Sequence, residues 1–189
     1  DKLLYLRSHY SDQLDEHLES EKGLKNRTSF VYYSPKKEKL EKKILFHVSD
    51  EPNVSHMESY MRAKNVVKPL IEGFHSMDAL SNYEFYESGA VSCPIPSTDH
   101  ADVFIEKAVP NLWTYYCCSQ TKNVSNRFVA QPLSRTRSIG MQLYKYKVKG
   151  FLHWGFNFYN TCRSYSAINP FAEQSGENWV PAGDMYLVY

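Results

Sequence analysis

The chain has 189 residues, of which 42% are hydrophobic and 15% aromatic, a composition typical of a globular domain with one hydrophobic core. Its 22 basic and 21 acidic side chains give a net charge of +1, which argues against nucleic acid or an anionic membrane as a partner. No apolar run reaches the ~20 residues of a membrane-spanning helix, and the first residues do not form a signal peptide.

The first part of the chain shows helical and strand patterns in alternation. Leucines at helical spacing predict a helix over residues 3–22. A short apolar run between charged residues and a proline predicts a buried strand over residues 44–49. The spacing over residues 55–72 predicts a second helix, with a kink or an early end at Pro69 because proline lacks the N–H that a helix interior needs.

Short strands and helices continue along the rest of the chain. We expect further strands over residues 74–78, 90–95, 112–118 and 150–157, and further helices over residues 102–109 and 127–148. From about residue 160 onward, several prolines and glycines favour an irregular tail.

This alternation predicts an α/β fold with a parallel sheet and helices outside it. About five strands are too few to close an eight-stranded barrel of ~250 residues. Because the chain opens on a predicted helix, we interpret residues 1–189 as one domain, the carboxyl-terminal half of a (β/α)8 TIM barrel cut from a longer protein. A complete flavodoxin-like domain is the alternative, although no glycine-rich phosphate loop follows any predicted strand.

Two adjacent acids, Asp50 and Glu51, follow the predicted strand over residues 44–49 directly. Pro52 prevents a helix from starting there, because the residue before a proline is pushed toward extended geometry. The carboxyl ends of parallel strands are where α/β folds keep their chemistry. The pair is therefore a candidate catalytic site, and an acidic turn after a strand is the alternative.

Five short motifs occur in a fixed order along the chain. They are HVSDEP at 47–52, LWTYYCC at 112–118, NRF at 126–128, GFLHWGFN at 150–157 and GDMYLVY at 183–189. Together they resemble glycoside hydrolase family 123, which contains β-N-acetylgalactosaminidases. The resemblance runs from about residue 44 to the last residue, and it implies that the amino-terminal half of the barrel and a β-sandwich precede this chain. It leaves the compartment unknown, with the bacterial cytoplasm and the cell envelope both open.

The resemblance implies cleavage of terminal β-linked N-acetylgalactosamine from a glycan or glycoconjugate, by a retaining, substrate-assisted mechanism without a cofactor. Carried onto this chain, Asp50 orients the 2-acetamido group of the substrate and Glu51 is the general acid/base. A conventional retaining pair of carboxyls faces the sugar from two sides, ~5–5.5 Å apart. Neighbouring residues leave a strand in opposite directions, so an adjacent pair suits a nucleophile that the substrate itself provides.

Five further residues are candidates for substrate binding. We expect Trp154 to form a wall of the sugar pocket, with a core tryptophan as the alternative, and Tyr115 to bind the acetamido group or the intermediate. Asp78, Asn157 and His75 lie near predicted strand ends and are candidates for binding sugar hydroxyls. With the acid pair, these side chains are expected to line one concave surface.

Two other function classes stay open. His47 and His56, together with the acid pair, suggest a metal-dependent hydrolase, but their spacing matches no helical or multi-strand zinc motif, so we expect no metal. A non-catalytic carbohydrate-binding or degenerate barrel is the other alternative. The cysteines show neither zinc spacing nor a disulfide framework, so we interpret them as reduced core residues: Cys93, Cys117, Cys118 and Cys162.

Overall fold

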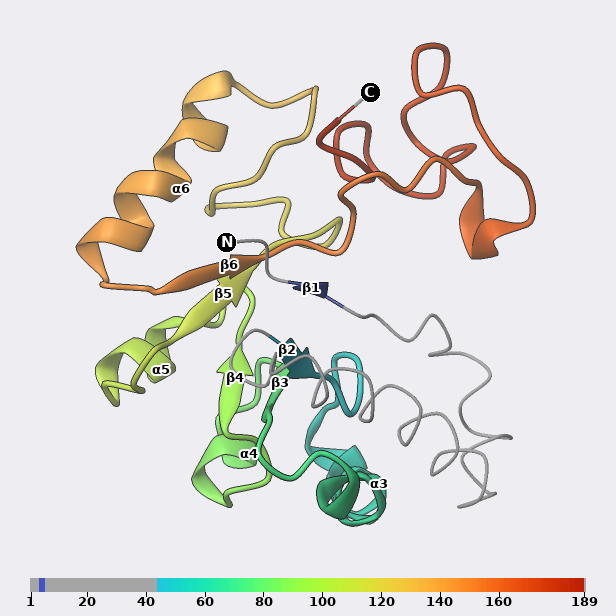
Figure 1. Cartoon of the computed structure of the whole chain (residues 1–189). Coiled ribbons are helices and arrows are strands. Elements are labelled where there is room, and N and C mark those ends of the chain that lie inside the picture. Colours follow the sequence, from blue (N-terminus) through green and yellow to red (C-terminus); the bar gives the residue numbers. More distant parts are fainter. Residues whose placement is uncertain (1–3, 6–43, 189) are drawn as a thin grey trace. The chain divides into compact units, whose positions relative to one another are not determined.

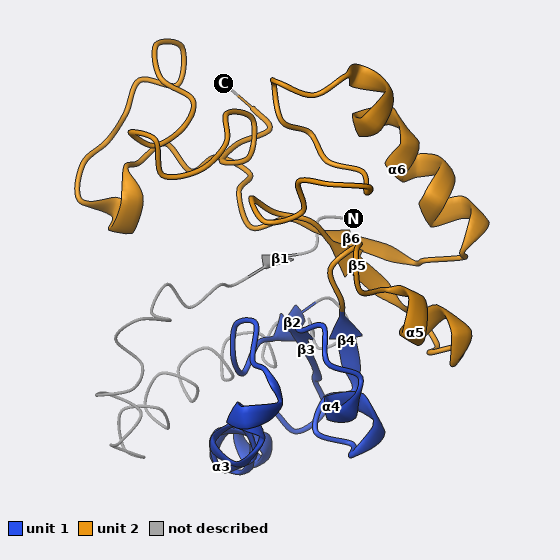
Figure 2. Ribbon diagram, turned by 180° about the vertical axis from the view of Figure 1, so that it is seen from behind, with its two compact units in different colours: residues 1–95 blue, residues 96–189 orange. Residues whose placement is uncertain are grey.

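The computed structural model describes residues 4–5 and 44–188. The chain divides into two compact units, Asp1–Ile95 and Pro96–Tyr189, shown in different colours in Figure 2. Every strand pair named within each unit is parallel, as the alternating sequence pattern predicts (Figure 1). Whether both units belong to one domain, as predicted, stays a prediction.

The first unit holds a four-stranded parallel sheet in the order β1-β2-β3-β4. Its strands are β1 (Leu4–Tyr5), β2 (Ile44–Phe46), β3 (His75–Ala79) and β4 (Cys93–Ile95). Among its described residues, the helical segments are η2 (Val54–His56), α3 (Met57–Val67), η3 (Lys68–Leu70) and α4 (Glu84–Glu87). The order of β2, α3 and β3 is the strand–helix–strand crossover that parallel pairing requires.

The core of the first unit forms where β2 meets the end of α3. Ile44 and Phe46 point to the same face because side chains alternate along a strand, and both are buried against Val67 and Ile71. Phe74 completes this cluster, with its ring edge-on to that of Phe46 at 5.1 Å between centroids. This packing fixes β2 and therefore the start of the loop that carries the acid pair.

The second unit contains α5 (Asp102–Glu106), β5 (Trp113–Tyr115), α6 (Leu133–Lys145), β6 (Gly150–Leu152) and η4 (Cys162–Ser164). Strands β5 and β6 form a parallel pair, and Ser97 bridges Tyr115 in parallel as well. Beyond β6 the chain is irregular apart from η4, with antiparallel bridges from Asn157 to Tyr186 and from Asn160 to Ala167. The irregular tail from about residue 160 is as predicted, but residues 153–157 were predicted to continue the strand.

Several predicted elements differ from those observed. Leu4–Tyr5 is a strand, so the helix predicted over 3–22 is wrong at these two residues, and the rest of it lies outside the described residues. The helix predicted over 127–148 spans only Leu133–Lys145, and the extended ψ of 136° at Pro132 immediately precedes it. Helix α4 was not predicted. The early end at Pro69 is confirmed, because α3 stops at Val67 and a 3-10 turn follows.

Four of the five predicted strands are shorter than predicted, and β5 and β6 have three residues each instead of seven and eight. Strand β3 keeps five residues and is shifted by one position. Over the described ranges they form a four-stranded and a two-stranded parallel sheet, without a closed barrel. The α/β class with parallel strands is therefore confirmed, and the half-barrel stays a prediction.

None of the four cysteines forms a disulfide in the described part of the chain. All four are partly buried and not fully buried as predicted, although Cys118 packs against a buried cluster of the second unit. Burial and the charge of Asp78 raise the pKa of Cys93, which keeps it a thiol. Among the helices in residues 4–5 and 44–188, none combines the length and the apolar character that a membrane-spanning segment needs.

Candidate active site

The predicted acid pair lies in a bend beyond β2. The strand ends at Phe46, and Asp50 and Glu51 are both exposed, while Pro52 behind them is buried. Glu51 has a φ of +46°, in the left-handed region that residues with a side chain rarely adopt. Its N–H donates to the carbonyl oxygen of Ala79, the last residue of β3, at 2.9 Å. The pair therefore lies at the carboxyl ends of β2 and β3.

This geometry changes one step of the sequence argument. Alternation of side chains applies to an extended strand, but Asp50 and Glu51 lie outside the strand and Glu51 is left-handed. Their directions are set by the bend and by the contact with Ala79, and the alternation rule does not apply to them.

Asp78 is fully buried in β3, and its carboxylate faces the segment that leads to the acids. Its Oδ1 accepts from the N–H of Val48 at 2.8 Å and of Ser49 at 2.9 Å, and it lies 2.7 Å from Nδ1 of His47. Its Oδ2 accepts from the hydroxyl of Tyr60, on α3, at 2.5 Å. Both oxygens are thus engaged within the protein, and the partners seen here support a positioning role over the predicted contact with sugar hydroxyls.

Two neighbours of Asp78 have shifted pKa values. Burial, the charge of Asp78 and the hydrogen bond to it raise the pKa of Tyr60 far above its ordinary value, so Tyr60 stays a donor. Burial by itself lowers the pKa of His47, but the hydrogen bond to Asp78 and the charges of Asp78 and Asp50 outweigh it. The net result is a pKa of His47 above its ordinary value, which favours an imidazolium beside the carboxylate.

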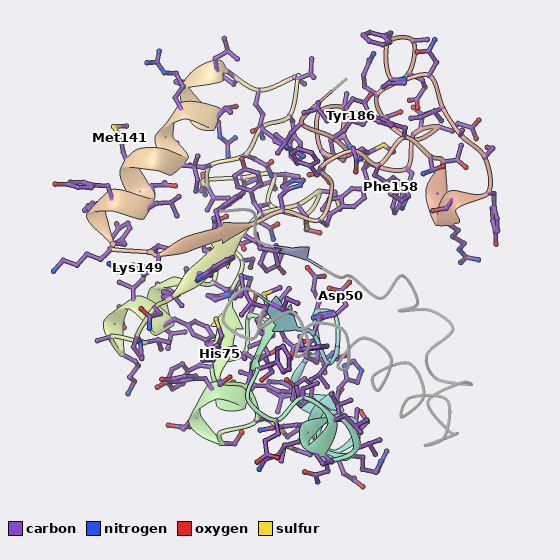
Figure 3. All side chains as sticks on the ribbon, viewed as in Figure 1. Asp50, His75, Met141, Lys149, Phe158 and Tyr186 are labelled. Carbon is purple, nitrogen blue, oxygen red and sulfur yellow. The ribbon has the colours of Figure 1, made fainter. Side chains whose placement is uncertain are left out.

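His75 opens β3, and Ala79 closes it. Three residues lie between them, and four steps along an extended strand span about 13 Å, so His75 lies at the opposite edge of the sheet from the acids. Figure 3 labels both His75 and Asp50. This position gives no support to the predicted contact of His75 with the sugar.

In the second unit, Trp154 lies just beyond β6 and is partly buried against Val180, Met185 and Tyr186. Its indole N–H donates to Oδ2 of the buried Asp184 at 2.8 Å. Its ring packs edge-on against Trp179, with 5.5 Å between the centroids. These contacts fix the orientation of the indole and leave part of its surface accessible.

The other two predicted residues of this unit differ in exposure. Tyr115 is buried, and its backbone N–H and C=O pair with Pro96 and Thr98. Asn157 is exposed and bridges Tyr186. Because these residues and Trp154 belong to the second unit and the acids to the first, their convergence on one surface stays a prediction.

A buried polar cluster around Trp154 was not predicted. The Arg127 guanidinium donates through Nη2 to the carbonyl oxygens of Gly155 at 2.9 Å and Asp184 at 2.7 Å, and it lies 3.0 Å from Nδ1 of His153. Nε2 of His153 lies 3.3 Å from Oδ1 of Asp184. Burial lowers the pKa of Arg127, while the nearby Tyr116 and Asp184 oppose this shift. The motifs NRF, GFLHWGFN and GDMYLVY contain these residues, but no local periodicity indicates that they meet.

The residues considered for a metal site do not form a cluster that could hold a metal ion. They are His47, His56, Asp50 and Glu51. His47 faces Asp78, and Nδ1 of His56 accepts from the N–H of Asn53 at 3.3 Å. No group of three or more His, Cys, Asp or Glu side chains that could hold a metal ion is found in the described part of the chain.

Known proteins share the sequence pattern and the fold of this chain. The family model described as glycoside hydrolase 123, catalytic domain, matches residues 16–189. Among solved structures, the chain is similar to a family 123 glycoside hydrolase from Clostridium perfringens, studied for the details of glycolipid glycan hydrolysis, with a TM-score of 0.62 and 15% identity. The match covers 97% of this chain and 31% of that hydrolase, and at this identity it shows a shared fold. No curated protein sequence matches the chain.

Proposed function

The chain belongs to glycoside hydrolase family 123, and from this premise we propose that the full-length protein cleaves terminal β-linked N-acetylgalactosamine from a glycan or glycoconjugate. The observation that carries the proposal is the exposed, adjacent pair of Asp50 and Glu51 at the carboxyl ends of β2 and β3. An accessible acid pair at this edge of a parallel sheet is suited to act on a bound sugar.

In the proposed reaction the nucleophile is the carbonyl oxygen of the substrate's own 2-acetamido group. This oxygen attacks the anomeric carbon while Glu51 gives its proton to the departing glycosidic oxygen. Asp50 holds the acetamido N–H and stabilises the positive charge of the resulting oxazolinium ion. Glu51 then takes a proton from water, which opens this intermediate with net retention of configuration.

The substrate-binding roles of the second unit belong to the same proposal. The fixed and partly accessible indole of Trp154 suits contact with the apolar face of a sugar ring. Asn157 is exposed and can donate to a hydroxyl. Tyr115 is proposed to bind the acetamido group or the intermediate, although only a small part of its surface is exposed.

Substitution of each acid tests the assignment. In Glu51→Gln the proton donor is lost but the internal nucleophile remains. Activity on a poor leaving group should therefore fall by ~10²–10⁴, the usual contribution of a general acid, and far less on a nitrophenyl glycoside. Asp50→Asn should lower activity on both substrates, because the charged intermediate loses its partner whatever group leaves. The measurement is kcat/KM on paired alkyl and nitrophenyl β-N-acetylgalactosaminides.

Glu58→Gln is the matched control, since Glu58 is an exposed glutamate of α3 paired with Arg62 at the surface. It should leave both rates unchanged. Equal losses on good and poor leaving groups in Glu51→Gln would contradict the role of Glu51. Cleavage of a substrate without the 2-acetamido group at the rate of its parent would contradict substrate assistance. A protein that binds the sugar without hydrolysing it would favour the carbohydrate-binding alternative.

A further inference from the structure

The loop between β2 and η2 is held by two consecutive residues of the neighbouring strand. Asp78 accepts from the N–H groups of Val48 and Ser49, and Ala79 accepts from the N–H of Glu51. These bonds link the end of β3 to three of the four residues from 48 to 51. The backbone on both sides of Asp50 is thus tied to one strand.

Asp78 also contacts the residue that precedes this loop. Nδ1 of His47 lies 2.7 Å from its Oδ1, and the imidazole side chain is only 7% exposed. A carboxylate with no exposed surface needs such partners, because burial without hydrogen bonds or a counter-charge disfavours the ionised form. Of the four partners of Asp78 in the described part of the chain, three lie in residues 47–49, immediately before the acid pair.

The fourth partner suggests the competing explanation. Tyr60 donates to Oδ2 of Asp78 from α3, so Asp78 could serve mainly to fasten that helix to the sheet. The left-handed backbone of Glu51 favours the first explanation. A residue in such a sparsely populated conformation persists only where its surroundings determine it, and Asp78 and Ala79 provide that determination here.

We propose that Asp78 is a positioning residue of the active site: its buried carboxylate holds residues 47–49 so that Asp50 and Glu51 are presented to the substrate. The inference rests on the proposed catalytic roles of these two acids. Asp78 itself touches no reacting atom, and it acts through the loop backbone.

The test combines one readout that is independent of catalysis with one that depends on it. Hydrogen exchange of the Val48 and Ser49 amides reports whether the loop is held, and kcat and KM report its consequence. Asp78→Ala removes Oδ1, the acceptor that both amides share, so these two amides should exchange faster, while amides inside α3 keep their protection. Its kcat should fall by about 10², because a misplacement of about 1 Å at an active site costs that much, and KM should change less.

Three further variants separate positioning from general structure. Asp78→Asn keeps an oxygen that can accept from both N–H groups, so it should restore amide protection and most of kcat. Tyr60→Phe removes only the bond from α3 and should lower kcat much less than Asp78→Ala. Ser92→Ala removes an exposed hydroxyl that donates to the carbonyl oxygen of Ser76, on the same strand as Asp78, and should change neither readout.

Each outcome supports or overturns the inference. Amides that stay protected in Asp78→Ala, or a Tyr60→Phe variant as impaired as Asp78→Ala, would overturn it. So would released amides with an unchanged kcat while Glu51→Gln is inactive on a poor leaving group, and the proposed function would then stand. Full activity of Glu51→Gln on that substrate would overturn the proposed function and, with it, the role of Asp78. If Asp78→Ala does not fold, the kcat values of Asp78→Asn and Tyr60→Phe decide. Both variants should keep most of kcat, and a large loss in Tyr60→Phe would overturn the inference.

Discussion

At the scale of single residues, Glu51 combines a proposed catalytic carboxylate with a φ of +46°. Left-handed geometry costs a residue with a side chain ~1–2 kcal/mol, and glycine avoids most of this cost. Glycine also makes the unfolded chain more flexible, which lowers the free energy of unfolding by ~0.4–1 kcal/mol and offsets part of this stabilisation. Glu51→Gly should therefore leave the free energy of unfolding unchanged or raise it by up to ~1 kcal/mol, while activity is lost.

Arg62→Gly provides the matched comparison for urea-unfolding measurements, because Arg62 is exposed in the interior of α3. Glycine there should lower the free energy of unfolding by about 1 kcal/mol. If Glu51→Gly destabilised the protein as much as Arg62→Gly, the left-handed backbone at residue 51 would not be strained.

The acid pair could be predicted because its signal is local: a short apolar run followed at once by two acids and a proline. The roles of Asp78 and His75 could not be predicted in the same way. In the sequence, both are polar residues near a predicted strand. Only the structure shows that the Asp78 side chain is buried and that His75 lies at the amino-terminal end of β3, away from the acids. The bond from Trp154 to Asp184 joins residues 30 apart in an irregular tail, where no periodicity predicts contacts.

At the scale of elements, apolar periodicity predicted the existence of helices and strands better than their ends. The predicted strand over 112–118 stops at Tyr115, and the N–H of Cys117 donates to the side chain of Gln120 instead of a neighbouring strand. Likewise, the Asn126 side chain donates to the carbonyl oxygens of Cys117 and Gln120, which anchors the segment before α6 outside a helix. Such side-chain-to-backbone bonds compete with regular structure and depend on tertiary contacts.

Two glycines in neighbouring elements should respond in opposite ways to alanine. Gly140 lies inside α6, and a Cβ there would meet nothing within 4 Å, so Gly140→Ala should raise the free energy of unfolding by ~0.5–1 kcal/mol. Gly150 opens β6, and a Cβ there would lie 2.1 Å from Cδ2 of Trp113, its partner in β5. Gly150→Ala should therefore lower it by ~1–3 kcal/mol, as overpacking usually does. Denaturant unfolding of both variants checks the pair, and equal effects would contradict the close approach of Trp113 to β6.

At the scale of the whole molecule, the parallel sense of the strands could be predicted from the alternation of elements, but the extent of the sheets could not. The chain spans 31% of the family 123 hydrolase whose fold it shares, so a large part of that protein has no counterpart in this sequence. Closure of a barrel depends on strands distant in the sequence, and this limits what 189 residues can predict.

The stability of the whole chain should depend on pH through groups whose pKa is shifted in opposite directions. Burial raises the pKa of Asp99, but hydrogen bonds from Ser97 and His100 outweigh it and leave the pKa below its ordinary value. Such a carboxylate stabilises the fold above its unfolded pKa of about 4, and this contribution is lost as the pH falls through its folded pKa. The pKa values of His47, Cys93 and Tyr60 are raised. The stability that these three groups contribute is therefore lost as the pH rises.

His47 is the group of these three that titrates nearest to neutral pH. Because its folded pKa lies above its unfolded value of about 6.5, its contribution is complete below pH ~6.5 and is lost as the pH rises through the folded pKa. The free energy of unfolding should therefore fall above pH ~6.5, with a slope from this group of at most about 1.4 kcal/mol per pH unit. His47→Gln should lower stability at pH 6 and flatten this part of the profile, whereas His75→Gln, at an exposed position of β3, should keep the slope of the parent protein. Urea-unfolding midpoints between pH 5 and 9 measure the three profiles, and an undiminished slope in His47→Gln would show that the ion pair with Asp78 does not govern this range.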